Sequence, residues 1–148
     1  MEIKFTLLLP RDALSVPIVC RVLNASMRTL GVQDSCLQDI EIALAEACTN
    51  VLDHSAKSDE YEVVAGLDDS RCVIEVVDTG RGFDAELLGH ADADPSAEEG
   101  RGIQLIRSLV DCVQFRSRPE AGMIVHLEKD LMFVSGSPLQ LLTDCARP

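Results

Sequence analysis

Two periodicities in the hydrophobic residues predict the first elements of the chain. Apolar and polar residues alternate over residues 2–9, which predicts a strand that Pro10 ends. Apolar residues recur every three or four positions between residues 12 and 30, which predicts a helix closed by Gly31. Pro17 lies near the start of that segment, where a helix tolerates proline.

The clearest helical pattern covers residues 33–54. Its apolar positions advance by three, four, three and four residues, so they form one stripe along the helix. The stripe consists of Leu37, Ile40, Leu44, Ala47 and Val51. It predicts a helix that buries one face in the core.

The second half of the chain contains β-rich runs separated by turn residues. Residues 60–68 and 71–77 predict a hairpin whose turn is Asp68-Asp69-Ser70. Residues 84–99 are acidic and poor in β-branched residues, which predicts a loop. After this loop we expect a helix that follows Gly102 and then two strands, at residues 103–110, 112–118 and 122–129.

The order of these elements indicates the fold class. It reads strand, helix, helix, two strands, loop, helix and two strands. Hairpin strands with helices stacked on one face form an α+β protein, here a two-layer α/β sandwich on a mixed, mainly antiparallel sheet. We expect residues 1–130 to form this domain. The tail, residues 131–148, defines no element, because Ser135-Gly136-Ser137-Pro138 interrupts its pattern.

Composition and charge narrow the function classes. The 148 residues suit one domain, and 47% hydrophobic with 26% charged residues is typical of a globular protein. Thirteen basic against 25 acidic side chains give a net charge of −12, which argues against direct binding to nucleic acid or to an anionic membrane surface. The six cysteines are scattered without a C-x-x-C pair, which favours a cytoplasmic protein.

The first candidate motif is EACTN, on the predicted helix 33–54. Glu46 and Asn50 lie four residues apart, so they project from the same face, one turn apart. A carboxylate can accept a proton from an attacking hydroxyl, and an amide oxygen can ligate Mg²⁺. Taken alone, the pair also fits a solvated helix face. Cys48 lies between them, and we expect it to be a buried structural thiol.

The second candidate motif is DTGRGF, at the end of a predicted buried strand. Asp78 is an acceptor suited to an exocyclic amine such as that of adenine. Gly80 and Gly82 allow a ring to lie against the backbone. Alone, the motif is equally typical of a turn.

The third candidate motif is EGRGI, which opens the predicted helix 103–110. Gly100 and Gly102 would leave free N–H groups pointing outward, and the helix dipole favours an anion there. Arg101 would add positive charge against a triphosphate. A flexible entry to a helix is the alternative interpretation.

Together, the three motifs resemble the GHKL (Bergerat) ATP-binding fold, and EACTN, DTGRGF and GRG look like those of the bacterial anti-sigma-factor serine kinases. The resemblance covers residues 3–130. It implies ATP and Mg²⁺ as cofactors, and a lid formed by residues 84–99. It also implies a homodimer and a partner switch, in which the protein binds either a sigma factor or a STAS-domain antagonist that it phosphorylates on Ser or Thr.

The resemblance implies a role for each matching residue. Glu46 would be the general base, and Asn50 would be the Mg²⁺ ligand within the nucleotide site. Asp78 would bind adenine in a pocket shaped by Gly80 and Gly82. The residues lining the phosphates would be Gly100, Arg101 and Gly102.

Two departures from the family pattern support a second hypothesis. Family members usually carry a threonine after the glycine of the last hairpin, whereas Met123 follows Gly122 here. Acidic side chains of the lid would repel phosphates: Asp84, Glu86, Asp92, Asp94, Glu98 and Glu99. The alternative is a non-catalytic anti-sigma binding module with weak or no nucleotide use, and the intact Glu46 and Asn50 favour the kinase over it.

Overall fold

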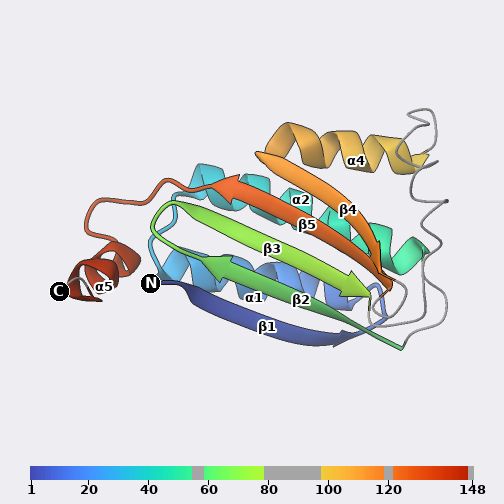
Figure 1. Ribbon diagram of the computed structural model, residues 1–148, viewed down its shortest axis with the longest axis horizontal. Coiled ribbons are helices and arrows are strands. Elements are labelled where there is room, and N and C mark those ends of the chain that lie inside the picture. Colours follow the sequence, from blue (N-terminus) through green and yellow to red (C-terminus); the bar gives the residue numbers. More distant parts are fainter. Residues whose placement is uncertain (55–58, 79–97, 119–121, 147–148) are drawn as a thin grey trace.

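The protein folds as a two-layer α+β sandwich, which confirms the predicted fold class (Figure 1). A computed structural model describes residues 1–54, 59–78, 98–118 and 122–146. The elements are β1 (Ile3–Pro10), α1 (Ser15–Thr29), α2 (Asp34–His54), β2 (Glu60–Leu67), β3 (Arg71–Asp78), α4 (Glu98–Leu109), β4 (Cys112–Arg118), β5 (Gly122–Asp130) and α5 (Pro138–Ala146).

One five-stranded sheet forms the first layer, in the order β1-β2-β3-β5-β4. Each of its four neighbouring pairs is antiparallel, so no parallel pair occurs between the described strands. Helices α1 and α2 cover one face of the sheet, and α4 packs beside α2 (Figure 1). The sheet and the helices enclose a single hydrophobic core.

The stripe predicted on α2 supplies the centre of that core. Its five members, Leu37 to Val51, are each at most 2% exposed, which confirms the predicted helix and its buried face. Burying one such aliphatic side chain contributes about 1.5–3 kcal/mol. Strands β2 and β3 meet the stripe with alternate residues, because successive side chains of a strand point to opposite faces.

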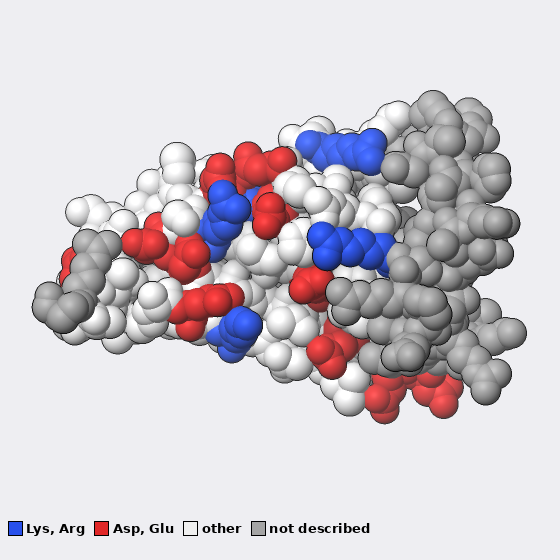
Figure 2. All heavy atoms as spheres, in the orientation of Figure 1, with Lys and Arg blue, Asp and Glu red and all other residues white. Residues whose placement is uncertain are grey.

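The opposite face of the sheet carries charged side chains of both signs (Figure 2). Arg71 on β3 lies 3.9 Å from Glu128 and 3.8 Å from Asp130, both on β5. His126, also on β5, lies 3.3 Å from Glu128. The mixture of signs is typical of a solvated face.

The predicted hairpin turn between β2 and β3 is confirmed. The Oδ1 atom of Asp68 accepts hydrogen bonds from the backbone N–H groups of Ser70 and Arg71, both at 2.8 Å. Burial raises the pKa of Asp68, but these bonds outweigh it and leave the pKa below its ordinary value. The turn is therefore held by one ionised side chain together with the backbone hydrogen bond from the N–H of Asp68 to the carbonyl of Arg71.

The tail contains a helix that the sequence pattern did not define. Helix α5 follows an isolated bridge between Val32 and Phe133, and the N–H of Leu139 donates to the carbonyl of Leu30. Leu139 is fully buried in the shared core. Gly31 has a φ of 94° and approaches the backbone of Ser137, so a side chain there would collide.

Helix α4 begins earlier than the sequence predicts. It starts at Glu98, so the prediction that the helix follows Gly102, and that the loop extends to residue 99, is wrong. Glycine weakens a helix by about 1 kcal/mol, but Ile103 and Ile106 are buried on α4 and stabilise it against the rest of the protein. Residues 84–97 of the predicted lid lie outside the described residues.

Candidate functional site

Three segments that carry predicted site residues come together at one end of the molecule. The C-terminal part of α2, the end of β3 and the start of α4 all lie toward the right-hand end of Figure 1. They are far apart in sequence, and the strand order and the packing of α4 on α2 bring them together. This end is therefore the candidate nucleotide site.

Glu46 and Asn50 meet Gly102 across the contact between α2 and α4. A Cβ placed on Gly102 would lie 3.0 Å from the Oε2 atom of Glu46 and 3.8 Å from both amide atoms of Asn50. Any larger residue at 102 would therefore press on the Glu46 carboxylate. Glu46 is half-buried and Asn50 is buried, so neither belongs to a fully solvated helix face. The first and third motifs thus share one small space.

Asn50 fits a magnesium ligand. Its side chain is 8% exposed, and its Nδ2 atom has no hydrogen-bond partner among the described residues. Proteins usually hold Mg²⁺ through one or two oxygen ligands, with water and substrate phosphates completing the shell. No group of three His, Cys, Asp or Glu side chains in the described part of the chain could hold a metal by itself. The unpartnered Nδ2 group is a donor that suits a phosphate oxygen, whereas the Oδ1 atom of Asn50 is the one that could ligate Mg²⁺. A site that nucleotide phosphates complete would use both atoms.

Asp78 ends β3 in a buried position. Its side chain is 1% exposed, and it lies opposite Tyr61 of β2. On the other side, Val77 pairs with Ile124 of β5, so the next position across from Asp78 is Met123. Met123 is also buried, and its thioether lacks the hydroxyl that a threonine would place beside this carboxylate.

Arg11 contacts a predicted site residue, although it belongs to none of the three motifs. Its Nη1 atom lies 3.3 Å from the Oδ2 atom of Asp78, and the Arg11 side chain is 9% exposed. Sequence periodicity cannot reveal this contact, because Arg11 lies just after a strand, outside any repeating pattern, and its partner is 67 residues away. The usable signal is general: a buried carboxylate requires a cation somewhere in the chain.

A buried polar cluster adjoins this position. The hydroxyl groups of Tyr61 and Ser15 are 2.6 Å apart. Burial raises the pKa of Tyr61 to about 12, so its hydroxyl stays protonated. Burial also raises the pKa of the Cys48 thiol, and Cys48 is fully buried, which confirms it as a structural thiol.

The remaining predicted residues are described in part or not at all. Gly80 and Gly82 lie outside the described residues. Gly100 and Arg101 belong to the first turn of α4, and the side chain of Arg101 is not among those described. The structure therefore brings together Glu46, Asn50 and Gly102, and it pairs Asp78 with Arg11.

This fold and this arrangement of residues define a class of protein. The family profile of the histidine kinase-like ATPase domain matches residues 9–129, and the chain belongs to that family. The match spans every predicted site residue. Within the described residues, no helix has the length and apolar character needed to cross a membrane.

More specific similarity points to one kind of relative. The chain is 29% identical to the serine-protein kinase RsbW of Bacillus thuringiensis (strain Al Hakam), over 92% of each chain. It has the same identity and coverage with the serine-protein kinases RsbW of Bacillus cereus (strain AH820) and Bacillus anthracis (strain A0248). The similarity extends over nearly the whole of both chains.

Proposed function

We propose that this protein is a cytoplasmic, ATP-dependent protein serine/threonine kinase that also acts as an anti-sigma factor. The family supports the use of ATP, and the name of the relatives supports a serine kinase. The observation that carries the proposal is the convergence of Glu46, Asn50 and Gly102. We assign the activity to residues 1–130, which the match over residues 9–129 supports.

In the proposed reaction, the side chains of this chain move one proton and orient the substrates. Glu46 takes the proton of a Ser or Thr hydroxyl on the antagonist while the oxygen of that hydroxyl attacks the γ-phosphorus of ATP. ADP leaves with the electrons of the broken bond. Asn50 would hold Mg²⁺, which would supply positive charge against the phosphates. Asp78 accepts a hydrogen bond from the exocyclic amine of adenine. Gly80, Gly82, Gly100, Arg101 and Gly102 complete the nucleotide site in this proposal.

The proposed partners are a sigma factor and a STAS-domain antagonist, in a partner switch. Phosphorylation releases the antagonist, and the freed kinase then holds the sigma factor. An apolar row on α1 offers a protein-binding surface, because Leu14, Ile18 and Val22 are 72%, 56% and 40% exposed. The same row would suit a homodimer. The net charge of −12 supports protein partners over nucleic acid or a membrane surface.

Met123 favours a second candidate, a non-catalytic anti-sigma binding module. It is 2% exposed and occupies the position across from Asp78, where it offers no hydroxyl to a nucleotide. A weakened adenine site would leave the protein to bind its partners without phosphotransfer. The two candidates differ in whether the wild-type protein binds MgATP.

Calorimetric titration of MgATP tests the proposal. We expect saturable binding by the wild type and a loss of about tenfold or more for Asp78→Asn, because a charged acceptor is removed. Asp130→Asn is the matched control, since Asp130 also pairs with an arginine but is exposed at the other end of β3 and β5. Absence of binding by the wild type would reject the kinase in favour of the binding module.

Phosphotransfer to a purified STAS-domain antagonist tests the role of Glu46. We expect Glu46→Gln to bind MgATP normally and to lose phosphotransfer by about 100-fold or more, because the proton acceptor is gone. Glu41→Gln is the control, since Glu41 is exposed on α2 and contacts Asn24. A Glu46→Gln protein with normal phosphotransfer would reject the base.

A further inference from the structure

Arg11 contacts the ends of β3 and α2 through its buried guanidinium, and the segment before β2 through its backbone N–H. Its Nη1 atom pairs with Asp78 at 3.3 Å. Its Nη2 atom donates to the backbone carbonyls of Val51 at 2.9 Å and Leu52 at 2.7 Å. Its own N–H donates to the carbonyl of Asp59, just before β2. The side chain therefore joins the end of β3 to the end of α2.

The acceptors of Arg11 suit a guanidinium better than an ammonium group. Val51 and Leu52 belong to the last turn of α2, whose carbonyls have no partner within the helix and carry the negative end of its dipole. The Asp78 carboxylate is buried and needs an opposite charge. A planar fork with several N–H donors can serve carbonyls and carboxylate together, whereas a lysine ammonium is a single point charge.

The position of this connection relates it to the nucleotide. Asn50 immediately precedes Val51, so the carbonyls that Arg11 binds belong to the helical turn that presents the amide. Asp78 is the residue that we propose for the adenine amine. Fixing the end of α2 against Asp78 therefore fixes the distance between the Asp78 carboxylate, proposed for the base, and the Asn50 amide, proposed for the phosphate side.

The strand neighbours of Asp78 do not supply a second charge. Tyr61 lies opposite Asp78 on β2, and its hydroxyl contacts Ser15. Met123 lies across from Asp78 on β5 and offers only a thioether. An arginine beside the carboxylate need not block a ligand, because a carboxylate has about four acceptor positions. The Arg11 contact can thus orient Asp78 while the carboxylate accepts a further donor.

We propose that Arg11 is a positioning residue that aligns the Asp78 carboxylate against the end of α2 and thereby sets the preference of this site for a purine with an exocyclic amine. The inference rests on the proposed function, since it concerns the same nucleotide site. Arg11 acts through Asp78 and does not touch the reacting atoms. In this proposal Arg11 affects how tightly the adenine base binds. The alternative is that Arg11 only stabilises the fold.

Binding of two nucleotides distinguishes a role in base recognition from a purely structural role. ATP carries the 6-amino group, and the triphosphate of purine riboside lacks it while keeping the ring and the phosphates. Dissociation constants for both, with Mg²⁺, are measured by calorimetry for the wild type, Arg11→Met, Arg11→Lys and the control Arg28→Met. Arg28 also pairs with an aspartate, at 2.6 Å, but its side chain is 59% exposed on α1.

The expected result is a loss of discrimination. The wild type and Arg28→Met should prefer ATP by about tenfold or more, since the analogue leaves a charged acceptor unused. Arg11→Met should reduce the preference to below about threefold, mainly through weaker ATP binding. Arg11→Lys keeps the charge without the fork, so its preference should lie between the two. It is also the variant that decides the matter if Arg11→Met does not fold.

Three outcomes would contradict this inference, and they differ from failure of the proposed function. Arg11→Met or Arg11→Lys could prefer ATP over the analogue as strongly as the wild type does. Either result would show that the guanidinium of Arg11 has no role in recognising the base. An equal loss of affinity for both nucleotides would reduce Arg11 to a structural residue. By contrast, a wild-type protein that binds neither nucleotide would reject the nucleotide site itself, and this inference with it.

Discussion

Gly102 lies where a helix would ordinarily benefit from alanine. Replacing glycine by alanine inside a helix adds up to about 1 kcal/mol of stability. The new methyl group, however, would lie 3.0 Å from the Oε2 atom of Glu46, which is the mobile end of a long side chain. The carboxylate can move away at little cost in stability, but it then leaves the position we propose for the base.

We therefore predict that Gly102→Ala separates stability from activity. The midpoint temperature of thermal unfolding should be unchanged or slightly raised. The rate of phosphotransfer to the antagonist should fall by about tenfold or more, because small displacements of a catalytic group are costly. Gln104→Ala is the control, since Gln104 is exposed on the same helix. Normal phosphotransfer by a stable Gly102→Ala protein would contradict the prediction.

Individual site residues differ in how far the sequence predicts them. Glu46, Asn50 and Asp78 are predicted because each belongs to a short motif with a chemical rationale. Arg11 was not found, because its role depends on a partner in a distant strand and on carbonyls at a helix end. Local patterns contain no information about such a contact until the sheet order is known.

The Asp68 carboxylate strengthens the turn that joins β2 and β3, beside the backbone hydrogen bond from Asp68 to Arg71. Its lowered pKa means that the ionised form is the one stabilised by folding. This stability is present above the ordinary value of 3.8 and is lost as the pH falls through the lower folded value. Asp68→Ala should cost about 1 kcal/mol at neutral pH, for the loss of its hydrogen bonds, and progressively less in acid.

Urea unfolding at several pH values measures this effect. Asp68→Asn is the matched control, because its amide oxygen can still accept the bonds from Ser70 and Arg71 but does not titrate. The stability difference between wild type and Asp68→Asn should therefore shrink in acid. A difference that stays constant down to about pH 2 would contradict the role of the charge.

Helix α5 buries one large apolar side chain, that of Leu139, together with the smaller Thr143. Leu139 is fully buried, whereas Leu141 on the same helix is 58% exposed. Leu139→Ala should therefore cost about 2–5 kcal/mol of unfolding free energy, and Leu141→Ala should stay within about 0.5 kcal/mol of the wild type. Equal effects of the two variants in urea unfolding would show that α5 does not pack as described.

The elements were predictable where one local pattern decided them. The stripe on α2 and the alternation in β2 and β3 reflect a buried face, and both elements were found. The start of α4 and the whole of α5 were not. In α4 packing of Ile103 and Ile106 outweighs two glycines, and in α5 the helix depends on a contact with Leu30, distant in sequence.

At the scale of the whole molecule, the core contains thiols that titrate only at high pH. Burial raises the pKa of Cys20 to about 11 and that of Cys72 to about 12, against 9.0 ordinarily. A raised folded pKa contributes stability that is complete below about pH 9 and is lost as the pH rises through the folded value. The protein should therefore lose stability steadily above about pH 9.

Urea midpoints at about pH 8 and about pH 10.5 test this expectation. Cys72→Ala should weaken the pH dependence, because one buried titrating group is gone. Cys145→Ser should leave it unchanged, since Cys145 is exposed on α5. If the urea midpoints of all three proteins depended equally on pH, the loss of stability at high pH would not come from Cys72.

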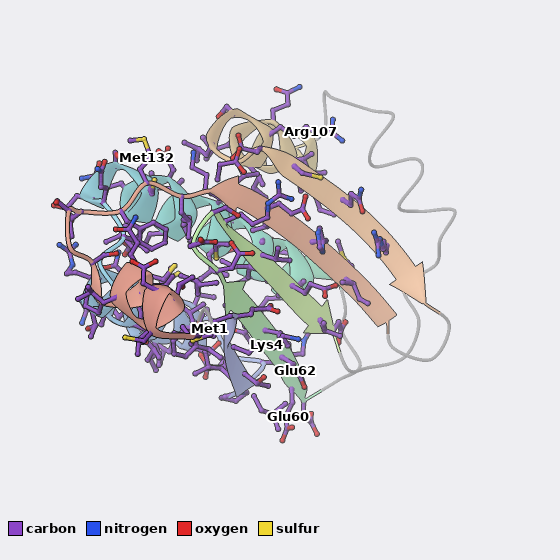
Figure 3. All side chains as sticks on the ribbon, turned by 60° about the vertical axis from the view of Figure 1, so that its left-hand side comes forward. Met1, Lys4, Glu60, Glu62, Arg107 and Met132 are labelled. Carbon is purple, nitrogen blue, oxygen red and sulfur yellow. The ribbon has the colours of Figure 1, made fainter. Side chains whose placement is uncertain are left out.

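The position of α5 also determines where a tether, a fluorophore or a fused module can be attached to the protein. Met1 and α5 lie together at one end of the sandwich, and the end of β3 and the start of α4 lie at the other (Figures 1 and 3). A tether, fluorophore or fused module added at either terminus would therefore leave the nucleotide end facing solution. The architecture thus suits surface immobilisation and two-colour distance measurements, in which a partner's approach is followed from the rear of the protein.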